Sequence, residues 1–325
     1  MEQAAEPRRA IIVAGPTCSG KSALALDLAR RLGGTVINAD SMQVYRELRV
    51  LTARPTPAEE AMAPHALYGI RPAALPGSAA WWRGAALDTM AACAVPILCG
   101  GTGMYFQVLT TGLAEVPEPG EPARAEARAM LAELGPAGLH ARLAAADPAT
   151  AARLRPTDSQ RLARAWEVWH GTGRGLAGWQ ATASGAIGWK FFAILLDPPR
   201  PALRAAIATR FETMLDNGAI EEARALAELR LDPALPAMRA HGVPQLMACL
   251  RGELALGEAV RRATLATGQY TKRQATWFRH HHMADPSQTH IIDARYGGET
   301  QFSETLEANL LTFLKSRVDD AASRA

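Results

Sequence analysis

Apolar residues in the first hundred positions follow two alternating patterns. Short continuous runs at 9–14, 35–38 and 95–99 have the length and composition of buried strands. Between them, residues 22–32 and 79–93 carry leucine and alanine at helical spacing. Strands that alternate with helices form a parallel sheet covered by helices, and such a sheet binds ligands beyond the carboxyl ends of its strands. The pattern therefore predicts an α/β fold with its site at that edge.

The pattern changes near the middle of the chain. A stiff segment with three prolines at 116–122 marks a domain border. Residues 122–169 place alanine, leucine and arginine at helical spacing without β-branched runs, which predicts a helical insertion. A loose stretch rich in glycine follows at 171–188. A strand at 191–196 then resumes the sheet, and the remainder, beginning with a helix at 201–218, is predicted to be mostly helical.

Chain length agrees with this division, because 325 residues suit about two domains, or one domain with a large insertion. Three parts are expected: a discontinuous core at 1–118 and 187–316, a helical insertion at 119–186 and a disordered tail at 317–325.

Composition excludes several classes of protein. Hydrophobic residues make up 48% and charged residues 21%, which is ordinary globular usage and not that of disordered or fibrous chains. No apolar run reaches the roughly 18 residues of a membrane span, and the N-terminus lacks a signal-peptide core. We therefore predict a cytoplasmic protein with no membrane partner. The four cysteines form no C-x-x-C pair, so we expect reduced thiols.

Net charge adds little, because a value of +3 does not by itself identify a nucleic-acid binder. The distribution of basic residues must decide that question. Only four of the 35 basic residues are lysines, namely Lys21, Lys190, Lys272 and Lys315.

A phosphate-binding motif is the strongest chemical signal in the chain. Residues 15–22 match G-x-x-x-x-G-K-[ST] between a predicted strand and a predicted helix, the context that the motif requires. Backbone N–H groups and the helix start would hold phosphate oxygens, Lys21 would neutralise charge, and Ser22 would bind Mg²⁺. We predict a P-loop NTPase-like parallel sheet core, in which the following residues bind the phosphates of a substrate: Gly15, Pro16, Thr17, Cys18, Ser19, Gly20, Lys21 and Ser22.

The nature of the phosphate compound is not set by the loop. The absence of an N-K-x-D motif argues against a GTPase. Asp197 follows the strand at 191–196 as a Walker B aspartate would, but the two prolines after it favour a plain exit from the strand.

Several further motifs together resemble the bacterial tRNA dimethylallyltransferases, also called tRNA isopentenyltransferases. The resemblance covers residues 10–282 and departs from the family at Val243, Pro244 and Gly268, where two potential RNA contacts are missing. The motifs that follow the family's order and spacing are 15–22, 40–45, 52–55, 64–65, 100–105, 160–165, 210–211 and 272–279.

This resemblance implies a specific reaction. A dimethylallyl group would pass from dimethylallyl diphosphate to the exocyclic amine of the adenine on the 3′ side of a tRNA anticodon, with release of diphosphate. The phosphate loop would then hold the diphosphate of an isoprenoid instead of ATP. The implied partners are the tRNA anticodon stem-loop and dimethylallyl diphosphate, the implied cofactor is Mg²⁺, and we expect a monomer.

Four residues are candidates for catalysis. An adenine amine is a poor nucleophile, so a carboxylate that takes its proton should help, and Asp40 at a strand end near the loop suits this role. A helix cap or a metal partner is the alternative for Asp40. Thr102 matches the family's threonine beside the reacting amine, although a helix cap suits it equally well. Lys21 and, by resemblance only, Arg210 would stabilise the leaving diphosphate.

The resemblance also implies a set of tRNA contacts. Taken singly, each charged residue among them is better explained as part of a solvated helix face. Trp166 and Trp169 are predicted to pack a helix, and the three histidines at 280–282 point in different directions on a helix, which argues against a metal cluster. The candidate tRNA-binding residues are Asp40, Ser41, Met42, Gln43, Thr102, Arg124, Gln160, Arg161, Arg164, Arg239, Lys272 and Arg273.

Two other functions remain open on the sequence. A small-molecule P-loop kinase, or an isopentenyltransferase acting on free adenine nucleotides, would not need the helical insertion. A P-loop RNA-binding protein without turnover would not need Asp40 and Thr102.

Overall fold

A six-stranded parallel sheet forms the centre of the larger of two units in the computed structural model, which describes residues 7–181, 188–297 and 304–315. Its strand order is β3-β2-β4-β1-β5-β6, and every neighbouring pair is parallel. The strands are β1 (Arg8–Ala14), β2 (Thr35–Asn38), β3 (His65–Ala66), β4 (Pro96–Gly100), β5 (Trp189–Leu196) and β6 (Thr289–Ile292).

The parallel α/β core predicted from the apolar pattern is confirmed, with two strands added. Strands β1, β2, β4 and β5 lie where the apolar runs predict them. The apolar pattern does not predict β3 and β6, because both are short edge strands and neither has a fully buried residue. Each of these two strands is defined by its parallel hydrogen bonding to a neighbour, β3 to β2 and β6 to β5, and not by an apolar run in its own sequence.

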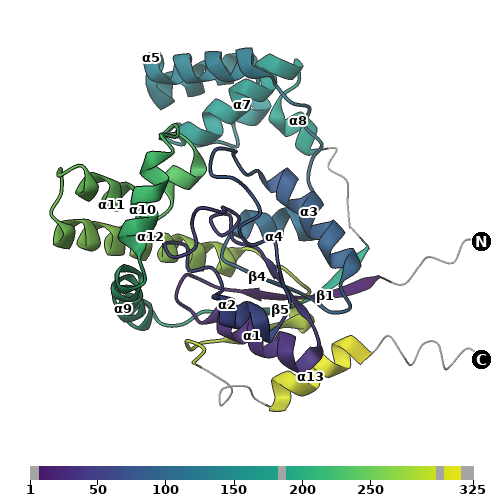
Figure 1. Cartoon of the computed structure of the whole chain (residues 1–325). Helices are drawn as coiled ribbons and strands as arrows, with labels where there is room; N and C mark the ends of the chain where they lie inside the picture. The colour runs from purple at the N-terminus through teal and green to yellow at the C-terminus, as the bar shows by residue number, and fades with distance from the viewer. Residues whose placement is uncertain (1–6, 182–187, 298–303, 316–325) are drawn as a thin grey trace, which may run out of the picture. The chain divides into compact units, whose positions relative to one another are not determined.

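Helices cover both faces of this sheet (Figure 1). Leu24 and Leu28 of the first helix pack with Ile11 and Val13 of β1, and Phe313 of the last described helix joins the same buried cluster. The helices of this unit are α1 (Lys21–Leu32), α2 (Pro57–Met62), α3 (Ala79–Ala92), α4 (Gly103–Thr110), α9 (Arg200–Asp216), α10 (Ala219–Glu228), α11 (Val243–Leu250), α12 (Leu256–His280) and α13 (Glu304–Lys315), with 3₁₀ turns η1 (Pro236–Arg239) and η2 (Pro286–Gln288).

Strand register brings three loops together at the carboxyl edge of the sheet. Ala14 of β1 is opposite Gly100 of β4, and Asn38 of β2 is opposite Cys99. Strands β1, β2 and β4 therefore end at the same level of the sheet, and the loops that follow them, 15–20, 39–43 and 101–102, lie next to one another. A side chain at Gly100 would lie 2.1 Å from the carbonyl oxygen of Ala39, so this close approach requires glycine.

The smaller unit spans 111–187 and is helical in its described part. Its helices are α5 (Glu121–Ala146), α6 (Pro148–Ala151), α7 (Ser159–Thr172) and α8 (Leu176–Gln180). Helix α5 is kinked at Gly135, whose φ of 67° precedes Pro136. Helix α8 corrects the expectation of a loose stretch, because Ala177 is buried and its N–H donates to the hydroxyl of Thr150.

Packing inside the smaller unit explains its tryptophans. Trp166 is 7% exposed in a cluster with Leu139, Leu143 and Leu162, and Trp169 packs against the same cluster. The prediction that these indoles pack a helix is confirmed. The predicted tail at 317–325 lies outside the described residues. All four cysteines are unpaired, and no described helix combines the length and apolar character of a membrane span.

Candidate active site

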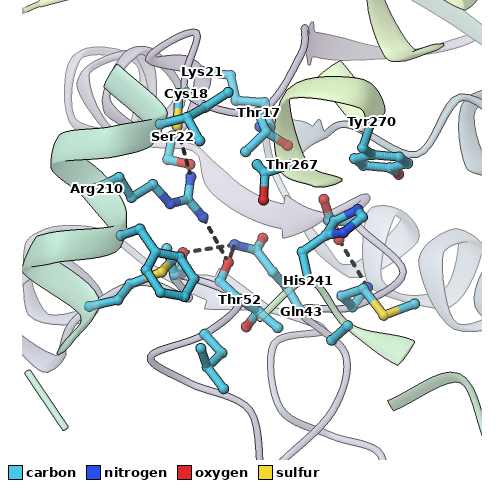
Figure 2. A pocket seen from close by; sticks show the side chains of 18 residues that line it. Thr17, Cys18, Lys21, Ser22, Gln43, Thr52, Arg210, His241, Thr267 and Tyr270 are labelled. Carbon is cyan, nitrogen blue, oxygen red and sulfur yellow. Dashed lines mark hydrogen bonds between the residues drawn. The ribbon is translucent and has the colours of Figure 1, made fainter. Parts of the chain in front are cut away.

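One cavity opens at the carboxyl edge of the sheet in the larger unit (Figure 2). It is built from the loop after β1, residues from two parts of the segment after β2 (40–43 and 51–53), helix α9, the turn at 240–241 and the middle of α12. Its polar and charged lining residues are Thr17, Cys18, Lys21, Ser22, Asp40, Gln43, Thr52, Arg210, His241, Thr267 and Tyr270. Most of the predicted phosphate and catalytic residues thus share one hollow with groups that the sequence analysis did not single out.

The phosphate loop has the backbone conformation that an anion site needs. Gly20 has a φ of 92° and Cys18 a φ of 66°, so the chain turns through left-handed positions before α1 begins at Lys21. Among the described residues, the backbone N–H groups of Cys18, Gly20 and Lys21 donate no hydrogen bond to another group. These donors and the start of α1 point to an anion-binding loop, with Lys21 only 9% exposed beside them.

Gln274 of α12 holds this loop from outside. Its side-chain oxygen accepts the N–H of Thr17 at 2.9 Å and the Thr17 hydroxyl at 3.1 Å. Its side-chain nitrogen donates to the carbonyl oxygen of Gly101 at 2.9 Å. Gln274 is 4% exposed, so these bonds are shielded from water. The N–H of Thr17 is therefore already bonded, and the phosphate loop is tied to the loop that follows β4.

Asp40 is held firmly at the cavity edge. Its N–H donates to the side chain of Asn38 at 2.8 Å, and its Oδ1 accepts the N–H of Met42 at 2.9 Å. No helix begins at Asp40, so the helix-cap interpretation is wrong. Among the described residues, Oδ2 has no hydrogen-bond partner. One oxygen thus orients the carboxylate and the other is available in the cavity.

Thr102 is close to this carboxylate loop but does not line the cavity. Its hydroxyl accepts the N–H of Ser41 at 2.9 Å and donates to the Ser41 hydroxyl at 3.2 Å. Thr102 therefore joins the ends of β4 and β2. Thr102 and Tyr270 also share a side-chain hydrogen bond.

Tyr270 and His241 form a wall that the sequence analysis missed. Their rings lie 4.9 Å apart, and both line the cavity. Burial, with a smaller contribution from Asp40, raises the pKa of Tyr270 to about 12, while burial and the charge of Arg273 lower the pKa of His241. Tyr270 is thus a neutral hydroxyl and His241 a neutral ring at pH 7. No motif signals this pair, because it is assembled from separate segments of the chain.

Arg210 enters the cavity from α9 (Figure 2). Its Nη1 lies 3.8 Å from the sulfur of Cys18, and its Nη2 donates to the carbonyl oxygen of Thr52 at 3.3 Å. Only the family resemblance singled out this arginine. Its contact with Cys18 places it beside the phosphate loop, where a leaving diphosphate would need a cation.

The candidate tRNA contacts fall into two groups in different units. In the larger unit, Ser41, Met42 and Gln43 follow β2, and the Gln43 amide donates to the carbonyl oxygens of Thr52 and Ala53. The remaining three are exposed: Arg239 on η1, and Lys272 and Arg273 on α12.

In the smaller unit, Gln160, Arg161 and Arg164 are exposed on α7 and Arg124 is on α5. Arg124 contacts Glu118, Arg161 lies 3.4 Å from Asp158, and Arg164 lies 3.2 Å from Glu167. Exposed ion pairs of this kind contribute little stability, so these arginines can exchange their partners for phosphates at small cost.

The structure supports neither a Walker B role for Asp197 nor a metal site at the histidines 280–282. Asp197 forms a two-point ion pair with Arg279, at 2.9 and 3.0 Å, and does not line the cavity. It is therefore a strand exit and not a Walker B aspartate. Within the described ranges, no group of three or more His, Cys, Asp or Glu residues could hold a metal ion, which includes the histidines at 280–282.

The donors present fit Mg²⁺ bound together with a substrate. Ser22 and Asp40 offer hard oxygen atoms to the same cavity. Mg²⁺ in phosphate-transfer sites typically takes one or two protein oxygens plus phosphate oxygens and water. Ser22 and Asp40 would supply the protein oxygens, and the diphosphate and water would supply the remaining ligands of the ion.

Comparison with known proteins gives consistent results along the chain. Residues 43–281 match the family described as IPP transferase, and residues 8–64 match the family described as isopentenyl transferase. The tRNA dimethylallyltransferase of Granulibacter bethesdensis is 60% identical over 314 residues, which cover 95% of this chain and 98% of the relative. That of Gluconobacter oxydans is 58% identical over 320 residues, which cover 97% and 96%.

Solved structures are similar as well. The tRNA isopentenylpyrophosphate transferase of Bacillus halodurans has a TM-score of 0.67 at 26% identity and covers 98% of this chain and 100% of its own. A eukaryotic dimethylallyltransferase acting on tRNA has a TM-score of 0.78 over 96% of this chain and 80% of its own. At 21% identity, the second likeness shows a shared fold.

Proposed function

The chain belongs to the family of tRNA dimethylallyltransferases, and from this membership we propose how its cavity performs the transfer. A dimethylallyl group passes from dimethylallyl diphosphate to the exocyclic amine of the adenine on the 3′ side of the tRNA anticodon. The observation that carries the proposal is the presence of the phosphate loop and Asp40 in one cavity. A kinase or a free-nucleotide enzyme is not favoured.

The phosphate loop and two cations bind the diphosphate of the isoprenoid. The N–H groups of Cys18, Gly20 and Lys21, which donate to no other described residue, and the ammonium of Lys21 face the phosphate oxygens. Arg210 adds a second positive charge from α9. As the bond between carbon and oxygen breaks, negative charge grows on the diphosphate, and these fixed donors stabilise it without reorganising.

Mg²⁺ would be held by Ser22 and by Asp40, directly or through water. When bound, the ion neutralises phosphate charge and so makes diphosphate a better leaving group. Asp40 would then combine a metal contact through one oxygen with proton transfer through the other, and the two roles make separable predictions.

Asp40 takes the proton of the adenine amine. The amine nitrogen forms a bond to the allylic carbon while the bond from that carbon to the diphosphate oxygen breaks. The nitrogen would keep a positive charge unless a base removes its proton, and Oδ2 of Asp40 is the available acceptor. Thr102 acts on this step by holding Ser41, the residue next to Asp40.

Gln274 is a positioning residue in this scheme. It fixes Thr17 of the phosphate loop and Gly101 next to Thr102, so it sets the spacing of the donor and acceptor sides. We expect Gln274→Leu, which keeps the size but removes three bonds, to lower the single-turnover rate about tenfold or more at saturating substrates, because small misplacement of reactants is costly.

A matched control tests that role for Gln274. Gln269→Leu, at an exposed position of the same helix, should leave the rate unchanged. A merely structural role would lower the melting temperature of Gln274→Leu and leave its rate per folded molecule at the wild-type value, which would contradict positioning.

Unpaired anticodon-loop bases are the usual targets of sequence-specific RNA binding, and enzymes acting on a base move it into a pocket. His241, Tyr270 and Gln43 would form the walls that receive the adenine.

The arginines of α5 and α7 would contact tRNA phosphates. A tRNA substrate agrees with the predicted cytoplasmic location, and the monomeric state stays a prediction.

Arg161 offers a test of the RNA contact. Arg161→Ala should raise the apparent binding constant for tRNA and reduce the slope of its logarithm against log salt by about one, the loss of one phosphate contact. The comparison is with Arg142→Ala, an exposed arginine of α5 in the same unit. A salt slope equal to that of wild type would count against the contact.

A direct assay distinguishes the activities. Purified protein is incubated with labelled dimethylallyl diphosphate and bulk tRNA, and separately with labelled ATP or with free AMP as acceptor. Label should enter tRNA alone. ATP turnover, or full activity on AMP, would favour the kinase or free-nucleotide enzyme, and tRNA binding without any transfer would favour a binding protein.

A further inference from the structure

A second chamber adjoins the active-site cavity at the phosphate loop. Three cationic side chains line this chamber and not the first hollow, namely Arg49, Arg54 and Arg295. Asp40 and His241 line only the first hollow. The residues that line both are Cys18, Lys21, Ser22, Ala53, Arg210 and Met214. The chamber therefore extends the diphosphate site on the side away from the acceptor.

Arg295 reaches this chamber from a short segment that follows β6. Its Nε donates to the carbonyl oxygen of Cys18 at 2.8 Å. The next residue, Tyr296, donates its N–H to the carbonyl oxygen of Ser19 at 2.9 Å and its hydroxyl to Asp27 at 2.7 Å. A side chain at Gly20 would lie 2.2 Å from the carbonyl oxygen of Tyr296. The segment is thus seated directly on the phosphate loop, with Arg295 anchored at one nitrogen.

The other chamber cations are held differently. Arg49 pairs with Glu60 at 2.8 Å. Arg54 donates only through Nη1, to the carbonyl oxygens of Tyr45 and Arg46 at 3.4 and 3.3 Å, and its Nε is buried without a partner among the described residues. For Arg295, no described residue accepts a hydrogen bond from the two terminal nitrogens or forms an ion pair with them. A guanidinium fixed at Nε with its terminal fork open is arranged for a planar, two-point contact with a phosphate.

We propose that Arg295 binds the terminal phosphate of the isoprenoid diphosphate, an assignment that rests on the proposed function of the cavity. The allylic carbon must lie toward Asp40 for transfer, so the phosphate farthest from it lies toward the outer chamber. Arg295 then adds a third positive charge to those of Lys21 and Arg210. The residue lies beyond the family match, which ends at residue 281, so neither motif nor family match points to it.

Calorimetric titration with inorganic diphosphate in the presence of Mg²⁺ tests this contact without tRNA. Arg295→Gln should weaken diphosphate binding about tenfold, as expected for a hydrogen-bonded charge contact, and raise the KM for dimethylallyl diphosphate more than it lowers kcat. Arg295→Lys should retain much of the affinity because it keeps the charge. Arg224→Gln, an exposed arginine of α10 outside both hollows, should bind as wild type does.

Tyr296→Phe separates bracing of the loop from phosphate binding. It removes the bond to Asp27 while leaving Arg295 in place, so the melting temperature should fall and diphosphate affinity should stay within about twofold. Wild-type diphosphate affinity in Arg295→Gln would overturn the proposal. Equal losses in Arg295→Gln and Arg295→Lys, each with a lowered melting temperature, would also overturn it, in favour of a structural brace. Arg295-dependent diphosphate binding without transfer to tRNA would leave the contact standing and refute the proposed function.

Discussion

Asp40→Asn should slow the chemical step by about 10²-fold or more, because the amide has nearly the same size as the carboxylate but no basic oxygen. The asparagine oxygen can still accept the N–H of Met42, and the N–H of residue 40 can still donate to Asn38, so the loop should keep its shape. Binding of tRNA and of dimethylallyl diphosphate should change little. Single-turnover rates at saturating concentrations of both substrates measure the effect.

A Mg²⁺ series separates the two roles of Asp40. If the carboxylate mainly holds the metal, added Mg²⁺ should restore most of the rate in Asp40→Asn, and that recovery would refute the base assignment. If proton transfer dominates, the deficit should persist at every Mg²⁺ concentration. Asp88→Asn, at an exposed position of α3, serves as the matched control and should behave as wild type.

The second large effect is expected for Lys21→Ala. This ammonium is nearly buried at the start of α1 and borders both hollows of the diphosphate site. Its loss should lower kcat about 10²- to 10³-fold, as for removal of a fixed charge-stabilising donor, and should also weaken dimethylallyl diphosphate binding. The fold should persist, because alanine suits a helix and no described ion pair depends on Lys21.

Lys190→Ala provides the comparison, since Lys190 is exposed on β5 and does not line the cavity. Circular dichroism and melting curves establish that both variants are folded. Unchanged kinetics for dimethylallyl diphosphate in a folded Lys21→Ala variant would remove Lys21 from the diphosphate site.

The site shows how far residue patterns reach. The loop at 15–22 could be predicted because its function depends on consecutive backbone groups, so its glycines and Lys21 are fixed in sequence spacing. Asp40 could be placed at the sheet edge because it follows a strand. Arg210 could not, because its neighbours Cys18 and Thr52 are distant in sequence, and only resemblance to relatives marked it.

The amino-acid sequence by itself determined the parallel α/β core, the helical insertion and the phosphate loop, because each depends on local periodicity or on adjacent residues. Only the tertiary structure decided which distant groups meet. It paired Asp197 with Arg279, placed Gln274 between Thr17 and Gly101, and set Arg295 against the phosphate loop. Contacts of this kind depend on strand order and helix packing, which bring together residues that are far apart in the sequence. No local pattern of residues along the chain predicts any one of these contacts.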